Sequence, residues 1–220
     1  IVWSGINSAG DNVTVVAAGN LLVNSPTFEL TSDSLSFEAA ENLSVAGTIK
    51  ATGNVFFVAV NGNQSNSSSI SAKSGTVIDQ LKLHAGKNLN FLDAQIPQVS
   101  SLLSIQAGQE LAQSADLLNW VMTGSSGELI VTAGGDLTIG RPQSVLHADQ
   151  SISISSTGYT NDSGVAVGGN LAVISVPGGY STALTKQLTL FATNYLHLHE
   201  SFSASEKLSM RGGQTMITRR

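Results

Sequence analysis

The chain has 220 residues, of which 11% are charged and 5% aromatic, with 22 glycines and no cysteine. Ordinary globular chains are about 25% charged, so the charged coat of a typical soluble enzyme is missing. The net charge of −5 and the ten scattered Lys and Arg residues exclude a concentrated basic surface for nucleic acid or anionic lipid, and the lack of cysteine excludes disulfides and thiolate metal sites.

The hydrophobic fraction of 41% is large enough to form a core. No apolar run reaches the 18 or so residues of a membrane-spanning helix. Residues Ile1 to Asn12 contain no basic region followed by an apolar stretch, so we expect no signal peptide in them. Because the sequence also starts without Met, we expect a segment of a longer protein.

An internal repeat runs along the chain. It has two apolar residues separated by one position, then Ala two positions later, and a second alternating apolar pair after three more residues. The good copies are Val13–Val23, Leu35–Val45, Leu81–Phe91, Leu103–Gln113, Leu129–Ile139 and Leu188–Leu198. Weaker copies are Ile49–Val58, His147–Ile154, Val165–Ile174 and Ala204–Met210.

Each copy predicts two short strands joined by a tight turn. Apolar residues at every second position are the signature of a strand, and the residues between the two stretches are typical of turns. The Ala after the first stretch, as at Ala17 and Ala133, fits a narrow inward-facing corner. The Asn or Asp before the second stretch, as at Asn20, Asn88 and Asp136, fits a corner where a side chain caps backbone groups.

The spacing of the copies predicts the fold. The starts at 13 and 35, and those at 81 and 103, each differ by 22 residues. Short strands at this period describe one coil of a parallel β-helix, in which stacked coils bury a continuous core. We therefore predict an all-β, right-handed parallel β-helix (a solenoid) with loop insertions, forming a single segment over residues 1–220. Dividing 220 by 22 gives about ten coils, and the right-handed rule for parallel crossovers sets the hand.

Other folds match the repeat less well. A β-sandwich would not place Ala at one position of a 22-residue register, and leucine-rich repeats need a different leucine spacing. A calcium-binding nonapeptide roll needs a pattern that Gly134-Gly135-Asp136-Leu137 breaks. Only Gln109 to Val121 has some helical spacing, and we predict a short helix or an irregular insertion there.

The repeats resemble those of a known family. Leu81-Lys-Leu-His-Ala-Gly-Lys-Asn-Leu-Asn-Phe91 and Leu129-Ile-Val-Thr-Ala-Gly-Gly-Asp-Leu-Thr-Ile139 look like repeats of filamentous haemagglutinin. This family comprises large exoproteins of Gram-negative two-partner secretion, both adhesins and contact-dependent growth inhibition effectors. The resemblance extends from about Val13 to Met210. The sequence has no Asn-Pro-Asn-Gly-type motif of the family's secretion domain and no segment that resembles the family's toxin domains. We therefore expect it to come from the middle of a parent exoprotein.

The resemblance implies a function without chemistry. It implies a rigid stick, secreted to the bacterial cell surface through the outer-membrane transporter of its secretion pair. The stick would carry a surface for an outer-membrane or host-cell receptor. We expect this chain to act as a monomer, to need no cofactor or metal, and to bind no nucleic acid. Inert shaft remains an alternative.

The insertions between coils are the candidate binding regions, because loops on a rigid scaffold carry function. Gly62 to Ser69 is predicted to be a polar loop. The other three insertions each carry an aromatic residue, and exposed aromatics are frequent binding anchors. The receptor-binding candidates are Trp120 in Leu117–Gly124, Tyr159 in Thr157–Ser163 and Tyr180 in Val176–Ser181. For Trp120 the competing interpretation is that it covers an apolar patch beneath its own insertion.

Two further groups of residues are candidates for a metal site and for an acid pair of an enzyme. His197 and His199 lie on one face of a predicted strand, where solvated side chains are the simpler interpretation than metal ligands. Glu110 and Asp136 occupy equivalent positions of successive coils, as the two carboxylates of a carbohydrate-active enzyme could. Because other coils have Asn at this position, a corner role is the simpler interpretation, and we predict no enzyme.

Overall fold

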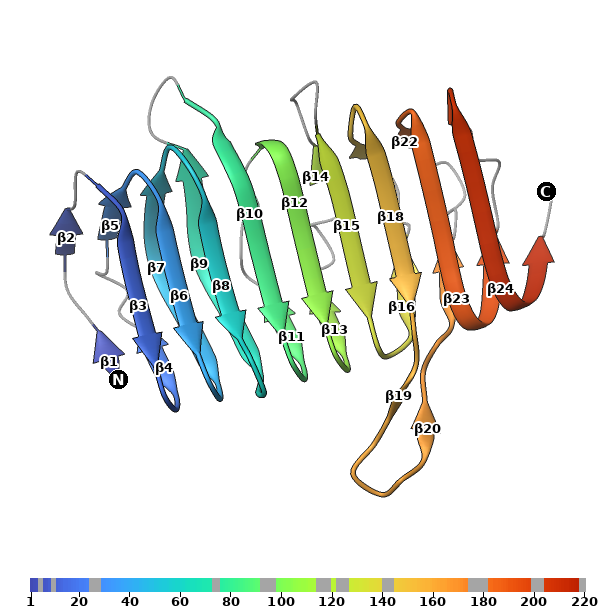
Figure 1. Ribbon diagram of the computed structural model, residues 1–220, viewed down its shortest axis with the longest axis horizontal. Coiled ribbons are helices and arrows are strands. Elements are labelled where there is room, and N and C mark those ends of the chain that lie inside the picture. The colour runs from blue at the N-terminus through green and yellow to red at the C-terminus, as the bar shows by residue number, and fades with distance from the viewer. Residues whose placement is uncertain are drawn as a thin grey trace.

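The computed structural model describes residues 1–3, 6–8, 11–23, 29–72, 76–91, 98–113, 120–121, 127–139, 145–173, 182–198 and 204–217. Within these ranges the chain is all-β, and parallel strands stack into a rod (Figure 1). The strands nearest the viewer run downward and those behind run upward, while the chain advances from left to right (Figure 1). This path is a right-handed solenoid: the repeat predicted the solenoid and the rule for parallel crossovers its hand.

The front face of the rod is one parallel sheet whose strands come from successive coils. Its strands are β3 (Val13–Ala17), β6 (Leu35–Ala39), β8 (Val55–Ala59), β10 (Ile78–Ala85), β12 (Val99–Ala107), β15 (Glu128–Ala133), β18 (Ser151–Ser156), β23 (Gln187–Leu198) and β24 (Lys207–Ile217). The coils therefore repeat the same strand in the same place, with the backbone of each bonded to the coils on either side.

The remaining strands form the other faces. One sheet contains β1 (Val2–Trp3), β2 (Ile6–Ser8), β4 (Leu21–Val23), β5 (Glu29–Ser32), β7 (Leu43–Ala51), β9 (Gln64–Ala72), β11 (Leu89–Phe91) and β13 (Leu111–Gln113). Further along the rod, β16 (Leu137–Ile139) pairs with β21 (Leu171–Val173), which pairs with the end of β23. A smaller sheet contains β14 (Trp120–Val121), β17 (Val145–His147) and β22 (Thr182–Leu184).

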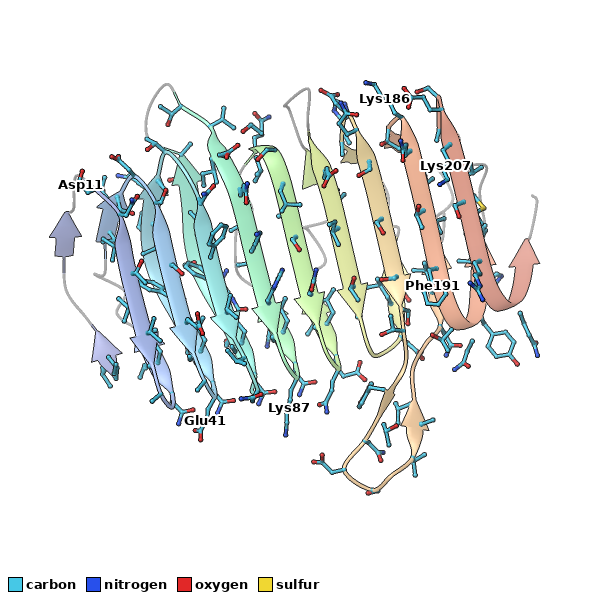
Figure 2. All side chains as sticks on the ribbon, in the orientation of Figure 1. Asp11, Glu41, Lys87, Lys186, Phe191 and Lys207 are labelled. Carbon is cyan, nitrogen blue, oxygen red and sulfur yellow. The ribbon has the colours of Figure 1, made fainter. Side chains whose placement is uncertain are left out.

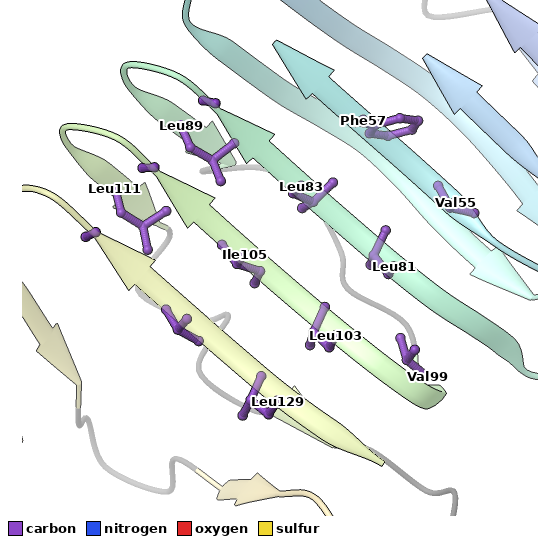
Figure 3. Close-up of a cluster of buried hydrophobic side chains, with 14 of the residues drawn as sticks. Val55, Phe57, Leu81, Leu83, Leu89, Val99, Leu103, Ile105, Leu111 and Leu129 are labelled. Atoms are coloured by element: carbon purple, nitrogen blue, oxygen red, sulfur yellow. The ribbon is translucent and has the colours of Figure 1, made fainter. Parts of the chain in front are cut away.

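The core fills the inside of the rod with side chains stacked in register. Leu81 pairs with Leu103 and Leu103 with Leu129, and all three are buried (Figure 3). The rings of Phe37 and Phe57 stack with centroids 5.5 Å apart. The predicted inward Ala corner is confirmed by register partners that are all buried: Ala17, Ala39, Ala59, Ala85, Ala107 and Ala133.

The number of turns is smaller than predicted. The rod has about seven turns instead of ten. One reason lies between Leu129 and Leu188, where two weak copies were expected to form two coils. The structure places a single front strand there, β18, because residues 158–169 leave the rod and residues 171–173 form only its next face.

The predicted polar loop at Gly62 to Ser69 is wrong. Residues from Gln64 onward form β9, which pairs with β7 residue by residue from Leu43↔Gln64 to Ala51↔Ala72. Gln64 and Asn66 point inward at positions where neighbouring coils have Leu and Val, and they are only 1% and 2% exposed. This segment is therefore a strand of the solenoid, although its sequence is polar.

The region from Gln109 to Val121 contains no helix in the residues that the structure describes. Leu111–Gln113 forms β13 and Trp120–Val121 forms β14, while residues 114–119 lie outside the described ranges. The strand pairing of Leu111 with Leu89 outweighs the helical spacing, because it continues the ladder of the preceding coil.

Candidate functional site

A line of amide side chains, the corner ladder, follows the turn between the front face and the next strand. The Oδ1 atom of Asn20 accepts hydrogen bonds from the backbone N of Asn42, at 3.1 Å, and from its Nδ2, at 2.9 Å. Asn42 in turn accepts from the backbone N of Asn63, and Asn63 from that of Asn88. The last step is a bond from Glu110 N to Asn88 Oδ1 at 3.0 Å. The predicted capping role of these residues is thus confirmed.

Glycines let the coils approach closely at the same corner. A Cβ atom added at Gly108 would lie 2.1 Å from the carbonyl oxygen of Gly86, and one added at Gly134 would lie 2.1 Å from that of Gly108. No real Cβ tolerates such a contact with backbone. By contrast, Ala18 and Ala40 occupy this position in the first coils, where the corner holds a Cβ atom. The corner therefore becomes tighter toward the middle of the rod.

The corner ladder is broken at Glu110. The described residues show no bond from its side chain to the next coil's Asp136, where the ladder would continue. Instead, its carboxylate occupies the space above Gly135, where an added Cβ would lie 2.3 Å from Oε2. Its Oε1 accepts a hydrogen bond from the Tyr159 hydroxyl at 3.1 Å. The ladder resumes when Asp136 Oδ1 accepts from the N and Nδ2 atoms of Asn170.

The break coincides with an insertion, the corner hairpin (residues 158–169), which projects from the lower edge of the rod (Figure 1). It contains the antiparallel pair β19 (Tyr159–Thr160) and β20 (Ala166–Val167). Of the five described glycines with positive φ, four lie in this hairpin, two of them at its exit, Gly168 and Gly169. Left-handed backbone at these positions turns the chain out of the solenoid and back into it.

The base of the corner hairpin is held between two coils. On one side, Thr157 N donates to Ala133 O at 2.9 Å, and Gly168 packs directly against the backbone of Gly134 and Gly135. On the other side, Asn194 Nδ2 donates to Gly168 O at 2.6 Å. These contacts fix the hairpin to the rod.

The tip of the corner hairpin is ordered by one side chain. Asn161 Oδ1 accepts from the backbone N of Ser163 and of Val165, both at 3.0 Å. Backbone bonds from Asn161 N to Val165 O and from Gly164 N to Asn161 O close the turn. Val165, at the end of this turn, is 56% exposed. The insertion therefore presents an apolar side chain on a fixed backbone.

Tyr159, one of the three aromatic candidates, lies at the start of this hairpin. Partial desolvation raises the pKa of its hydroxyl, and the hydrogen bond to Glu110 and the charges of Glu110 and Asp162 raise it further. The hydroxyl is therefore a neutral donor at physiological pH. Its role is to tether the hairpin to the coil of Glu110, 49 residues earlier.

A second surface feature, the axial groove, lies on the front face beside this corner. It has a volume of about 390 Å³ and crosses the ends of β8, β10, β12, β15 and β18. Its residues are Val58, Ala59, Val60, His84, Ala85, Gly86, Gln106, Ala107, Gly108, Thr132 and Thr157. Thr157 immediately precedes the corner hairpin, so the groove ends where the hairpin begins.

The polar side chains of the axial groove are held in place by buried or neighbouring hydroxyls. His84 Nε2 lies 2.9 Å from Ser104 Oγ, and Gln106 Nε2 donates to the same Oγ at 3.2 Å. Ser104 is only 2% exposed. Thr132 Oγ1 lies 3.0 Å from Ser155 Oγ. Burial lowers the pKa of His84, and the charge of Lys82 lowers it further, so the imidazole is neutral at pH 7.

The other predicted site residues are not brought together with these features. Trp120 begins β14, where it pairs with Leu146 of β17, and only its backbone is described. Tyr180, with its whole insertion Val176–Ser181, and His199 lie outside the described residues. His197 is half-buried in β23 between the buried Leu196 and Leu198. Among the described residues, no group of three or more His, Asp or Glu side chains could hold a metal ion.

The acid pair Glu110 and Asp136 has separate hydrogen-bond partners. Glu110 bonds to Tyr159 and Asp136 to Asn170. Neither residue lines the axial groove. The pair occupies successive corners, as the repeat predicted, and each carboxylate accepts hydrogen bonds from a structural neighbour.

The axial groove was not predicted from the sequence, although the repeat places four of its residues in one register. Val58, His84, Gln106 and Thr132 each directly precede the Ala of a front-face strand and are register partners. Their outward direction follows from the period of two. The repeat does not predict that the surface is hollowed along this row of residues, because that depends on how the neighbouring corners pack.

Comparisons with known proteins found no match among family models, curated proteins or solved structures. Among the described residues, no helix is both long enough and apolar enough to cross a membrane.

Proposed function

We propose that this chain is a rigid segment of a secreted, filamentous-haemagglutinin-like exoprotein that presents a binding surface to neighbouring cells. The observation that carries the proposal is the corner hairpin. It is an ordered insertion at a corner that is a short turn in the other coils described, and it exposes Val165 while its base is held on both sides. A shaft needs no such insertion, and its cost to the corner ladder is visible at Glu110.

Rigidity supports a binding role. Association is weakened when side chains and loops must become ordered, and a surface that is already fixed avoids that loss. Asn161 fixes the tip of the hairpin, and Tyr159 and Asn194 fix its base. The proposed partner is a receptor on the surface of another bacterium or a host cell. The proposed route to the cell surface is the outer-membrane transporter of the parent exoprotein's secretion pair.

The mechanism is recognition without chemistry. Glu110 and Asp136, the residues that an enzymatic role would use, each accept hydrogen bonds within the rod. In this proposal Glu110 is a positioning residue for the hairpin, which leaves adhesion or delivery of a distant domain as the task of the parent protein.

The chain offers a clean test of the proposal. Deleting residues 158–168 joins Thr157 to Gly169 and produces Ser156-Thr-Gly-Asn-Leu171, which matches regular corners such as Ala17-Ala-Gly-Asn-Leu21. The fluorescently labelled chain should bind saturably to at least one cell type in a panel of Gram-negative bacteria and mammalian cells. The deletion variant should fold, as judged by circular dichroism, and lose that binding.

Single substitutions provide a matched control for this test. Val165→Ser removes the exposed apolar side chain of the hairpin, and Val16→Ser removes one that is 61% exposed on the regular front face. We expect Val165→Ser to weaken cell binding and Val16→Ser to leave it unchanged. If no cell type binds the intact chain, or if the deletion variant binds equally well, the receptor proposal fails and plain shaft remains.

A further inference from the structure

The axial groove is elongated along the rod, a shape that suits a chain-like ligand. It crosses five neighbouring front strands, from Val58 on β8 to Thr157 after β18. Four steps between paired strands of about 4.8 Å each make it roughly 19 Å long. Its volume of about 390 Å³ is within the range of ligand sites. A molecule that lies along the rod, rather than a compact one, fills this shape.

The charge of the axial groove excludes ionic ligands. Its lining contains no Asp, Glu, Lys or Arg side chain. The one titratable group, His84, is neutral at pH 7 because burial and Lys82 lower its pKa. Nucleic acids and sulfated polymers are bound mainly through Lys and Arg, which this lining does not supply. The site therefore suits an uncharged ligand.

The backbone of the groove floor excludes strand addition by a peptide. Such a peptide needs a free sheet edge. Here β10 pairs with both β8 and β12, and β15 pairs with both β12 and β18. The backbone donors and acceptors of these strands are already used between coils, so recognition must come from side chains.

The side chains alternate hydrogen-bonding groups with apolar surface. His84, Gln106 and Thr132 provide one polar group per coil, at register-equivalent positions. Val58, Val60 and the small corner residues provide the apolar surface between and beside them. Ser104 holds His84 Nε2 and Gln106 Nε2, which leaves His84 Nδ1 and Gln106 Oε1 directed to other partners. A carbohydrate chain offers the matching pattern, with hydroxyls and C–H faces in every repeat.

We propose that the axial groove binds an extended, uncharged oligosaccharide, with His84, Gln106 and Thr132 as its hydrogen-bonding groups. This inference deepens the proposed function, since it names the chemistry of a cell-surface ligand. It uses a different part of the rod from the corner hairpin, although Thr157 joins the two.

The test uses soluble sugars and the intact chain. Neutral linear hexasaccharides of glucose, mannose and galactose are titrated into the ¹⁵N-labelled chain, with a heparin hexasaccharide as the charged probe. At least one neutral sugar should shift the backbone amides of residues 84, 106 and 132, and heparin should not. Gln106→Ala should weaken that binding about tenfold, the effect of losing about one hydrogen bond. Glu38→Gln, on the same outward line but outside the groove, should not change it.

The outcomes separate this inference from the proposed function. The groove proposal is overturned if no neutral sugar shifts these amides, if only heparin binds, or if Gln106→Ala binds as tightly as the intact chain. Cell binding that depends on the corner hairpin while no neutral sugar binds would overturn the groove alone. Sugar binding without any cell binding would support the groove and overturn the hairpin proposal.

Discussion

Two stretches of the same corner differ in what their side chains do. From Asn20 to Glu110, each side chain of the corner ladder caps the next coil, and the turn is short. From Glu110 to Asn170, one step is missing and the corner hairpin is inserted. Glu110 differs from Asn by one methylene and a charge, and its carboxylate reaches Tyr159 instead of the next backbone N–H. The regular stretch stabilises the rod, and the interrupted stretch displays a surface.

The charged residues that Figure 2 labels lie at the two edges of the rod. Glu41 and Lys87 lie at the lower edge of the rod, along the corner from which the hairpin projects, and Asp11, Lys186 and Lys207 lie at the upper edge (Figure 2). Phe191, by contrast, lies on the front face (Figure 2).

The largest expected effect on stability comes from adding a side chain in the tight part of the corner. Gly134→Ala places a Cβ 2.1 Å from the carbonyl oxygen of Gly108, so the coils must separate. We expect a loss of about 3 kcal/mol in the free energy of unfolding, measured by urea denaturation. As a control, Gly19→Ala, one position further along the corner of the first coil, should have almost no effect, since the nearest neighbour of its Cβ would be at 4.0 Å. Equal losses at the two sites would contradict the close backbone approach at Gly134.

The next effect comes from interrupting the corner ladder where it is regular. Asn42→Ala removes the acceptor for Asn63 N and the donor to Asn20 Oδ1. Because partly exposed hydrogen bonds each contribute about 1 kcal/mol, we expect a loss of about 2 kcal/mol. Asn61→Ala is the control, as this exposed side chain lies outside the ladder. A loss below about 0.5 kcal/mol for Asn42→Ala would show that the ladder contributes little.

A third substitution should stabilise the rod. Gln64 sits in register between Leu43 and Leu89, and its Oε1 and Nε2 atoms are buried without a hydrogen-bond partner. Gln64→Leu removes two unpaired polar atoms at similar volume, so we expect a gain of about 1 kcal/mol. Ser65→Ala, at the outward neighbour, should change stability much less. A destabilised Gln64→Leu variant would mean that the amide has a partner inside the rod.

The smallest effect concerns the axial groove and pH. The pKa of His84 in the folded chain lies below 6.5, so the unfolded chain binds a proton more readily. The stabilising contribution of neutral His84 is therefore present above pH 6.5 and is lost as pH falls below it. An NMR titration of the imidazole should give a midpoint below 6.5, and Lys82→Ala should move it upward. A midpoint at or above 6.5 would contradict the burial of this ring.

Most of the regular stretch could be predicted from the sequence, and less of the interrupted one. Ala17 and Asn20 recur in register, so the fold, the inward corner and the capping side chains could all be predicted. Gln64 could not be assigned to a strand, because polar residues replaced the alternating apolar pair. Tyr159 could be placed in an insertion, but its bond to Glu110 spans 49 residues and has no counterpart in the repeat. The depth of the axial groove depends on how successive corners pack, which periodicity does not encode.

The central claim, that the corner hairpin is a fixed part of the rod, is tested most directly by hydrogen–deuterium exchange. The amides of Asn161, Gly164 and Val165 each donate a hydrogen bond within the hairpin. They should exchange at least about tenfold more slowly than in an unfolded chain. Tyr159→Phe should speed their exchange, because it removes the tether to Glu110, while amides of β10 and β12 stay protected. Exchange of the hairpin amides at the unfolded-chain rate in the intact protein would contradict the account.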